Sequence, residues 1–243
     1  MIIKIISYFL FVFLISKYFK DKKMLSNFSG DKHQIYLNDK NIPLIGGFVL
    51  LYPIFQLFKE YDLLILFSLL IFFVGLLSDT KILESPKIRI VIQIILIILF
   101  VTLNDIKINS SRLELFDLFL ENLFFAYLFS SFCILILING SNFIDGLNGL
   151  LLGYTLLVLY FLNKNGLLID LNLEKADTIF FFFVLTFLFI LNISNKVMLG
   201  DSGAYFIGFL LGYAVIKLHN YNDMISAYYF ISLIWYPCFE NLF

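Results

Sequence analysis

The sequence predicts an all-α, polytopic integral membrane protein with about nine transmembrane helices. Hydrophobic residues fill 61% of the 243 positions, charged residues fill 14%, and the mean hydropathy is +0.94. A typical soluble domain carries roughly 25% charged residues. Here the charges cluster between apolar runs of about membrane-spanning length, so lipid is the expected solvent for most of the chain. A soluble globular protein is thereby excluded.

Nine apolar runs are expected to form these helices when the chain is read with a window of about 20 residues. Charged residues 20–23 follow the first run where a signal peptide would have a small-residue cleavage site, so we interpret this run as a span. The second and third runs are short for a bilayer, and Pro53 is expected to kink the second. No repeat or polar linker divides the chain, so residues 1–243 are expected to form a single membrane domain. The nine runs are 2–19, 44–58, 63–77, 88–103, 117–138, 149–162, 179–193, 204–218 and 225–240.

The charge balance and the cysteines argue against two further classes of protein. The net charge is −1 and no stripe of Lys and Arg appears, so no basic field exists to attract nucleic acid. Cys133 and Cys238 lie in or beside apolar runs, where a thiol behaves as a small hydrophobe rather than as half of a disulfide framework.

Most of the polar residues that could bind a ligand or take part in a reaction are expected on one side of the membrane. If the nine runs alternate in direction, the connections at 20–43, 78–87, 139–148 and 194–203 share a face. These connections hold the Asp, Asn and Gly clusters described below, and most of the 17 Lys and Arg residues lie on the same side. By the positive-inside tendency, this face is expected to be cytoplasmic.

The connection after the fifth run carries Asn139, Asn142 and Asp145 at a spacing of three. A continuing helix would bring these side chains toward one face, and the Asn-Gly and Asp-Gly steps allow tight turns. The pattern therefore indicates a site where amides and a carboxylate converge. Capping of the following helix by Asp145 is the structural alternative for that residue, but it leaves the two aligned asparagines unexplained.

The segment Gly200-Asp201-Ser202-Gly203 opens the eighth run. Small residues there let a phosphate or metal approach the backbone at a helix N-terminus, whose free N–H groups favour anions. Asp201 is a candidate ligand for a hard cation. The alternative is an N-cap at Asp201 or Ser202, with glycines that pack against neighbouring helices.

A third polar segment contains Asp79 at the end of the third run and the pair Ser85-Pro86, a good start for the fourth helix. Arg89 and Gln93 then lie one turn apart on one helix face. Arg89 suits a phosphate and Gln93 suits an amide partner. Positive-inside flanking for Arg89 and a hydrogen bond between helices for Gln93 are the alternatives.

The last candidate segment places Asp31-Lys32-His33 before Gly46-Gly47. A lone loop histidine is more often a solvated side chain than a ligand. Paired glycines at the start of a span most often serve close packing. Taken alone, this segment predicts little.

Together these segments resemble the polyprenyl-phosphate N-acetylhexosamine-1-phosphate transferases of glycosyl transferase family 4, which include the bacterial translocase that makes lipid I. The resemblance implies transfer of N-acetylhexosamine-1-phosphate from a UDP-sugar to undecaprenyl phosphate, with release of UMP and a requirement for Mg²⁺. It also implies a bacterial inner-membrane protein that starts a lipid-linked cell-envelope glycan, such as cell-wall material or lipopolysaccharide, with its active site facing the cytoplasm. Whether it forms a homodimer stays open. The matching segments are 43–47, 75–79, 89–93, 139–149 and 200–203.

The resemblance assigns roles to individual residues. Asp201 is similar to the principal magnesium ligand, and Asn142 and Asp145 resemble the residues that complete the metal and diphosphate site. Asp79 matches the second member of an aspartate pair near the lipid phosphate, where it acts as a base or orients the acceptor. The other expected substrate-binding residues are Gly146 and Asn148 near the nucleotide base, together with Asn139, Gly46, Gly47 and Arg89.

Three departures from the family pattern affect these expectations. Ser78 stands at the first position of the aspartate pair, and Asn148 replaces an aspartate that is common in bacterial members. Family members also continue into a histidine-containing loop and usually another span, so the chain resembles a member truncated at its C-terminus. The sugar is not specified by the sequence.

An ion-coupled transporter and an inactive membrane protein are the competing interpretations. Carboxylates and asparagines near membrane level are common in transport pathways, where they lie at the bilayer midplane on broken helices. The sequence instead places Asp145 and Asp201 at the ends of apolar runs. The transferase interpretation requires these two carboxylates to meet at one end of the molecule.

Overall fold

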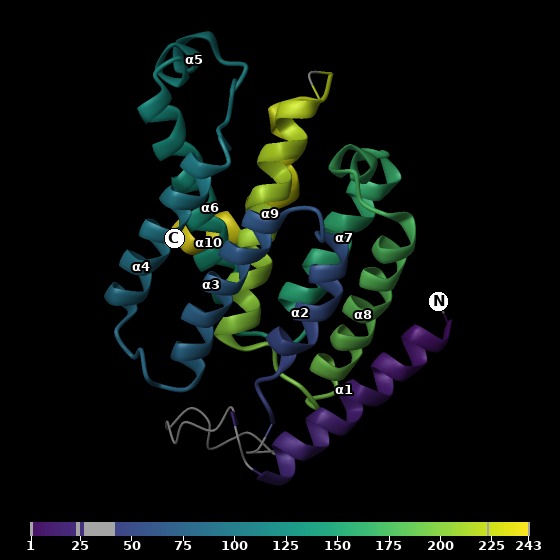
Figure 1. The fold of residues 1–243 in the computed structure, drawn as a ribbon. Coiled ribbons are helices and arrows are strands. Elements are labelled where there is room, and N and C mark those ends of the chain that lie inside the picture. The colour runs from purple at the N-terminus through teal and green to yellow at the C-terminus, as the bar shows by residue number, and fades with distance from the viewer. Residues whose placement is uncertain (1, 23–24, 27–41, 223, 243) are drawn as a thin grey trace.

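The computed structural model describes residues 2–22, 25–26, 42–222 and 224–242, and shows an assembly of helices (Figure 1). The expected segment Asp31-Lys32-His33 lies outside the described residues. The elements are α1 Ile2–Lys22, α2 Gly46–Leu57, α3 Asp62–Asp79, α4 Pro86–Leu103, α5 Glu114–Leu120, α6 Leu123–Ile144, α7 Leu150–Lys164, the 3₁₀ helix η2 Leu167–Leu171, α8 Lys175–Ile193, α9 Gly200–Tyr221 and α10 Ala227–Leu242. The predicted all-α class is confirmed.

Within the described ranges, six helices are long and apolar enough to cross a membrane, namely α1, α3, α4, α6, α8 and α9. The helices α2 and α7 are apolar but shorter, with 12 and 15 residues. A bilayer core needs about 20 residues of helix. The chain is therefore a multi-pass membrane protein, although these criteria support six spans where the sequence predicted nine.

The expected run 117–138 is two helices, which is the largest difference from the predicted boundaries. The Asn122 side chain accepts hydrogen bonds from the backbone N–H groups of Phe124 and Phe125, at 3.0 and 3.3 Å, and so starts α6 separately. At its other end, α6 continues through the Asn139-Gly140 step to Ile144. Gly140 serves close packing here and not a turn, because a Cβ at this position would overlap the backbone of α10.

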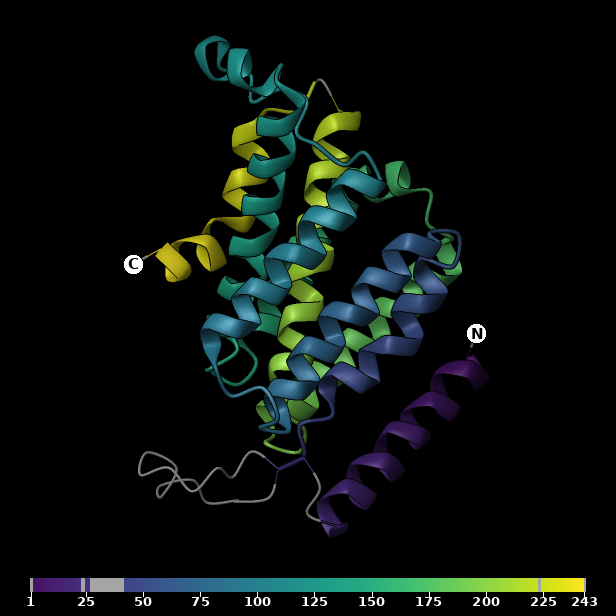
Figure 2. The ribbon, with the colours of Figure 1, turned by 60° about the vertical axis from the view of Figure 1, so that its left-hand side comes forward.

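The helix α9 forms the centre of the fold, with 94% of its most apolar window buried, and packs mainly against α3 and α6 (Figures 1 and 2). Glycines allow this close approach. A Cβ at Gly208 would lie 2.6 Å from the Leu137 carbonyl oxygen of α6, and one at Gly212 would lie 3.1 Å from the Ile134 side chain. Small residues at such spacing let helix backbones meet in a membrane, where packing replaces the hydrophobic effect as the driving force.

One end of the bundle, the lower end in Figure 1, gathers connections that are far apart in sequence. The α3–α4, α6–α7 and α8–α9 connections meet there with the start of α2. Two hydrogen bonds join distant segments, from the Met198 N–H to the Pro43 carbonyl at 3.0 Å and from the Gly46 N–H to the Met198 carbonyl at 2.9 Å. The polar connections therefore share one face, as the alternation of runs predicted.

Candidate active site

Three carboxylates from three helices converge at this end of the bundle. Asp79 is the last residue of α3, Asp145 follows the last residue of α6, and Asp201 is the second residue of α9. Burial raises the pKa of Asp145 well above its usual value, and the negative charges of Asp201 and Asp79 raise it further. The segments that carry Asp145 and Asp201 therefore meet on one side of the protein, together with Asp79.

The Asp79 carboxylate caps the N-terminus of α9 from a neighbouring helix. Its Oδ1 accepts a hydrogen bond from the Asp201 N–H at 2.8 Å, and its Oδ2 accepts one from the Ser202 N–H at 3.1 Å. Leu199, which holds the N-cap position, contributes no side-chain hydrogen bond. A carboxylate there satisfies unpaired helix N–H groups and lies at the positive end of the helix dipole.

Gly200 makes this close approach possible. Its φ of +76° is a left-handed conformation, and a Cβ at position 200 would lie 2.7 Å from Oδ2 of Asp79. The alternative in which Asp201 or Ser202 caps α9 is thus replaced by a cap from α3. The glycine lets the helix N-terminus reach the Asp79 carboxylate.

The Asp201 carboxylate is held by Arg89 and Ser78. Its Oδ2 accepts from Nη1 of Arg89 at 2.7 Å and from the Ser78 hydroxyl at 2.5 Å. Arg89 also donates to the Tyr205 hydroxyl at 3.2 Å. A single arginine thus connects α4 with α3 and α9 and offsets the charge of one carboxylate. No described group donates to Oδ1 of Asp201, which leaves that oxygen free for a ligand.

The asparagines of α6 have different surroundings. Asn139 donates to Oε1 of the fully buried Gln93 at 3.0 Å, so it connects α6 to α4. Asn142 is partly buried, and no described residue forms a hydrogen bond with its side chain. Neither oxygen of Asp145 accepts a hydrogen bond from the described part of the chain, so this residue does not cap α7. Asn142 and Asp145 are therefore free to meet a ligand at the end of α6.

The expected binding residues Gly46 and Gly47 pack α2 against the start of α9. A Cβ at Gly47 would lie 2.8 Å from the Gly203 nitrogen. Gly146 and Asn148 are instead exposed on the α6–α7 connection, where the Asn148 amide donates to Asn195. Gly146 and Asn148 thus lie at the exposed edge of the site. Gly46 and Gly47 instead let the backbone of α2 pack closely against the start of α9.

The sequence reasoning missed Asn192, which is 2% exposed near the end of α8. Its Oδ1 accepts from the Gly149 N–H, and its Nδ2 donates to the Val197 carbonyl at 3.1 Å. This one side chain fixes the start of α7 relative to the segment that leads into α9. An amide within the apolar run 179–193 was the available signal.

Comparison with known proteins decides the family. A sequence model described as glycosyl transferase family 4 matches residues 62–219, which span α3 to α9 and include the three carboxylates. The chain belongs to glycosyl transferase family 4. The resemblance drawn from the motifs is thereby confirmed, and the position of the carboxylates at helix ends agrees with it better than with a transport pathway.

Two relatives extend this comparison. Both are phospho-N-acetylmuramoyl-pentapeptide-transferases, one from Wolbachia sp. subsp. Drosophila simulans (strain wRi) and one from Wolbachia pipientis wMel. Each relative is 28% identical to this protein over 225 residues, and the match covers 83% of the chain and 67% of the relative. The chain thus spans about two thirds of the length of these relatives.

Proposed function

We propose that this protein transfers an N-acetylhexosamine-1-phosphate group from a UDP-sugar to undecaprenyl phosphate and releases UMP. The observation that supports this proposal best is the convergence of Asp145 and Asp201 within the region matched by the family. The name of the two relatives makes UDP-N-acetylmuramoyl-pentapeptide the first donor to test within this class. The product would start a lipid-linked glycan of the cell envelope.

In this reaction a phosphate oxygen of the lipid attacks the phosphorus that carries the sugar. The anhydride bond to UMP breaks, and UMP leaves with the bridging oxygen. A phosphate monoester is largely dianionic near pH 7, so the nucleophile needs little activation. The harder task is to reduce the repulsion between the lipid phosphate and the diphosphate.

Asp201, Asp145 and Asn142 would hold a magnesium ion. Mg²⁺ prefers one or two carboxylates together with waters and phosphate oxygens, and no described group occupies the Asp145 carboxylate or Oδ1 of Asp201. Burial raises the pKa of Asp145, and the repulsion from Asp201 and Asp79 that raises it further also favours a cation at this position. When bound, the metal supplies the positive charge that neutralises the phosphates.

Other residues of the chain keep this donor set in place. Arg89 and Ser78 orient Asp201 through Oδ2, and Asp79 fixes the first turn of α9 on which Asp201 lies. We therefore assign Asp79 a positioning role. Gly146 and Asn148 are exposed beside the carboxylates and would contact the nucleotide base.

The proposal includes an orientation in a bacterial inner membrane with the carboxylate end facing the cytoplasm. The bias of Lys and Arg toward this side supports that orientation.

The test combines the purified protein with undecaprenyl phosphate and Mg²⁺. UDP-N-acetylglucosamine and UDP-N-acetylmuramoyl-pentapeptide are supplied in parallel, and UMP and the lipid product are measured. Asp201→Ala should lower turnover by about a hundredfold or more, the usual size of a lost electrostatic contribution. Glu121→Gln, at an exposed position between α5 and α6, is the control. An Asp201→Ala protein as active as the parent would reject the assignment, and a donor that reacts identifies the sugar.

A further inference from the structure

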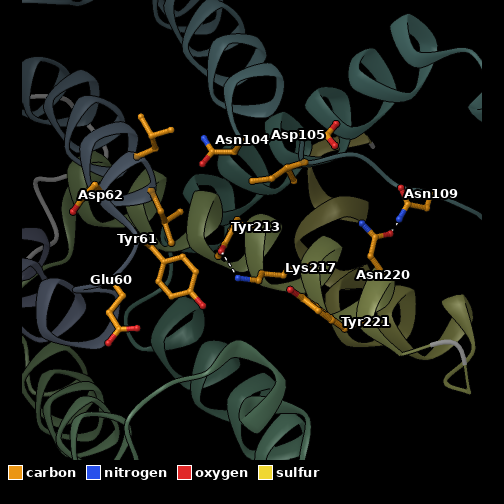
Figure 3. Close-up of a pocket in the computed structure, with 13 residues that line it drawn as sticks. Glu60, Tyr61, Asp62, Asn104, Asp105, Asn109, Tyr213, Lys217, Asn220 and Tyr221 are labelled. Carbon is orange, nitrogen blue, oxygen red and sulfur yellow. Dashed lines mark hydrogen bonds between the residues drawn. The ribbon is translucent and has the colours of Figure 1, made fainter.

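A polar cavity lies at the end of the bundle opposite to the three carboxylates. It encloses about 630 Å³ between the α2–α3 connection, the end of α4 and the last turns of α9 (Figure 3). On α9, Lys217 of this cavity is separated from Asp201 by about 24 Å of helix. The cavity is therefore distinct from the candidate active site, and a ligand bound there would be independent of the proposed function.

Lys217 contributes a positive charge to this cavity. It is partly buried, and its Nζ donates to the Tyr213 hydroxyl at 3.0 Å and lies 4.2 Å from the centre of the Tyr61 ring (Figure 3). No carboxylate of the described chain forms an ion pair with it. Aromatic faces offset only part of a cation's charge, and an ammonium has three donors, so Lys217 can still bind an anion.

Two exposed carboxylates line the same cavity. Glu60 and Asp62 are exposed on either side of Tyr61, and neither takes part in an ion pair or hydrogen bond among the described residues (Figure 3). A third lining carboxylate, Asp105, is already paired, because the Lys107 ammonium lies 2.5 Å from its Oδ1. The cavity thus presents unpaired charges of both signs.

We propose that this cavity binds a zwitterionic lipid head group, with its phosphodiester at Lys217 and its ammonium at Glu60 and Asp62. An anion alone would face the two carboxylates, and a cation alone would face the lysine. A head group that carries both charges on a short linker avoids both repulsions. The cavity volume also lies within the range of about 300–1,000 Å³ that is typical of small-molecule sites.

The position of the cavity favours a membrane lipid as the source of this head group. Lys217 lies one turn before the end of α9 at Tyr221, where the apolar span ends. Tyrosines are enriched at the boundary between membrane and water, and Tyr61, Tyr213 and Tyr221 all line the cavity. Phosphate and ammonium groups of lipids lie at this level, so an amino-phospholipid such as phosphatidylethanolamine is the proposed ligand.

Lipid binding to the purified, delipidated chain tests the proposal. Native mass spectrometry would measure phosphatidylethanolamine, phosphatidylglycerol and phosphatidylcholine in parallel. We expect Lys217→Met to weaken phosphatidylethanolamine binding about tenfold, the effect of one charge-assisted hydrogen bond, and Lys217→Arg to restore it. The control Lys164→Met removes the same charge from an exposed position at the end of α7 and should leave binding unchanged. Unchanged binding in Lys217→Met would overturn the proposal.

The carboxylates are tested separately by the double change Glu60→Gln and Asp62→Asn. Because both side chains are exposed, this variant should fold like the parent. It should lose the preference for phosphatidylethanolamine over phosphatidylglycerol, and a retained preference contradicts the role of these residues. Soluble phosphoethanolamine forms the last comparison. If it raises the melting temperature while the lipids bind without preference, the lipid assignment is wrong and a soluble zwitterion is the ligand.

Discussion

Substitution of Asp79 distinguishes a residue that positions α9 from one that accepts a proton. In Asp79→Ala, the N–H groups of Asp201 and Ser202 lose both carboxylate oxygens, which lie at 2.8 and 3.1 Å. Loss of a cap costs about 1–2 kcal/mol. The charge of Asp79 is favourable at the helix N-terminus, but repulsion from Asp145 and Asp201 opposes it, so we expect a destabilisation of about 1–2 kcal/mol. Asp79→Asn keeps one acceptor and should cost about 1 kcal/mol.

These values correspond to measurable changes in melting temperature. For a chain of about this size, 1 kcal/mol shifts the melting temperature by about 2–4 °C, so we expect drops of about 2–8 °C for alanine and 2–4 °C for asparagine. Cys133 and Cys238 are partly buried, so a thiol-reactive fluorophore would report their exposure on unfolding. Release of UMP would be measured on the same samples.

The two roles of Asp79 predict different pairs of results. A positioning residue loses stability and turnover together, and Asp79→Asn retains much of both with an unchanged pH profile. A general base contributes about 10²–10⁴ in rate, so its loss in Asp79→Asn would remove turnover without lowering the melting temperature. That second outcome would refute the capping argument. Glu121→Gln, at an exposed position between α5 and α6 that belongs to neither site, should change neither quantity.

Three further substitutions test the site. Burial raises the pKa of Asp145 above its unfolded value, so ionisation of this carboxyl group destabilises the fold as pH rises. Asp145→Asn should therefore raise the melting temperature at about pH 8 and change it much less at about pH 4. The same variant should lose turnover. Arg89→Met leaves Asp201 without its cation and should cost about 1–3 kcal/mol, with Mg²⁺ stabilising the variant more than the parent. Gly75→Ala places a Cβ against the α9 backbone and should cost about 1–3 kcal/mol or more, whereas Gly146→Ala meets only one oxygen at 3.2 Å and should melt like the parent.

Each of these expectations has a clear contrary result. An Asp145→Asn protein that melts below the parent at every pH would show that the carboxylate is stabilising. An equal effect of Mg²⁺ on the parent and on Arg89→Met would separate Asp201 from the metal. Equal melting temperatures for Gly75→Ala and Gly146→Ala would contradict the close contact between α3 and α9. Thermal unfolding measures all three.

The positions of most helices could be predicted because membrane spans are a local property. Length and hydropathy within about 20 residues are sufficient to locate them. The exceptions have local causes that a window of this size averages away. Asn122 starts a new helix inside the run 117–138, and Gly140 continues α6 because it packs against α10.

The sequence by itself determined the class of protein, the identity of the polar segments and the end of the bundle at which they gather. Hydropathy and the alternation of spans contain that information. Only the tertiary structure decided the partner of each side chain: Asp79 caps a helix 121 residues further along the chain, and Arg89 holds Asp201. Such partners depend on how closely the helices pack at Gly47, Gly75 and Gly203, and no spacing along the chain specifies the distance between two helices.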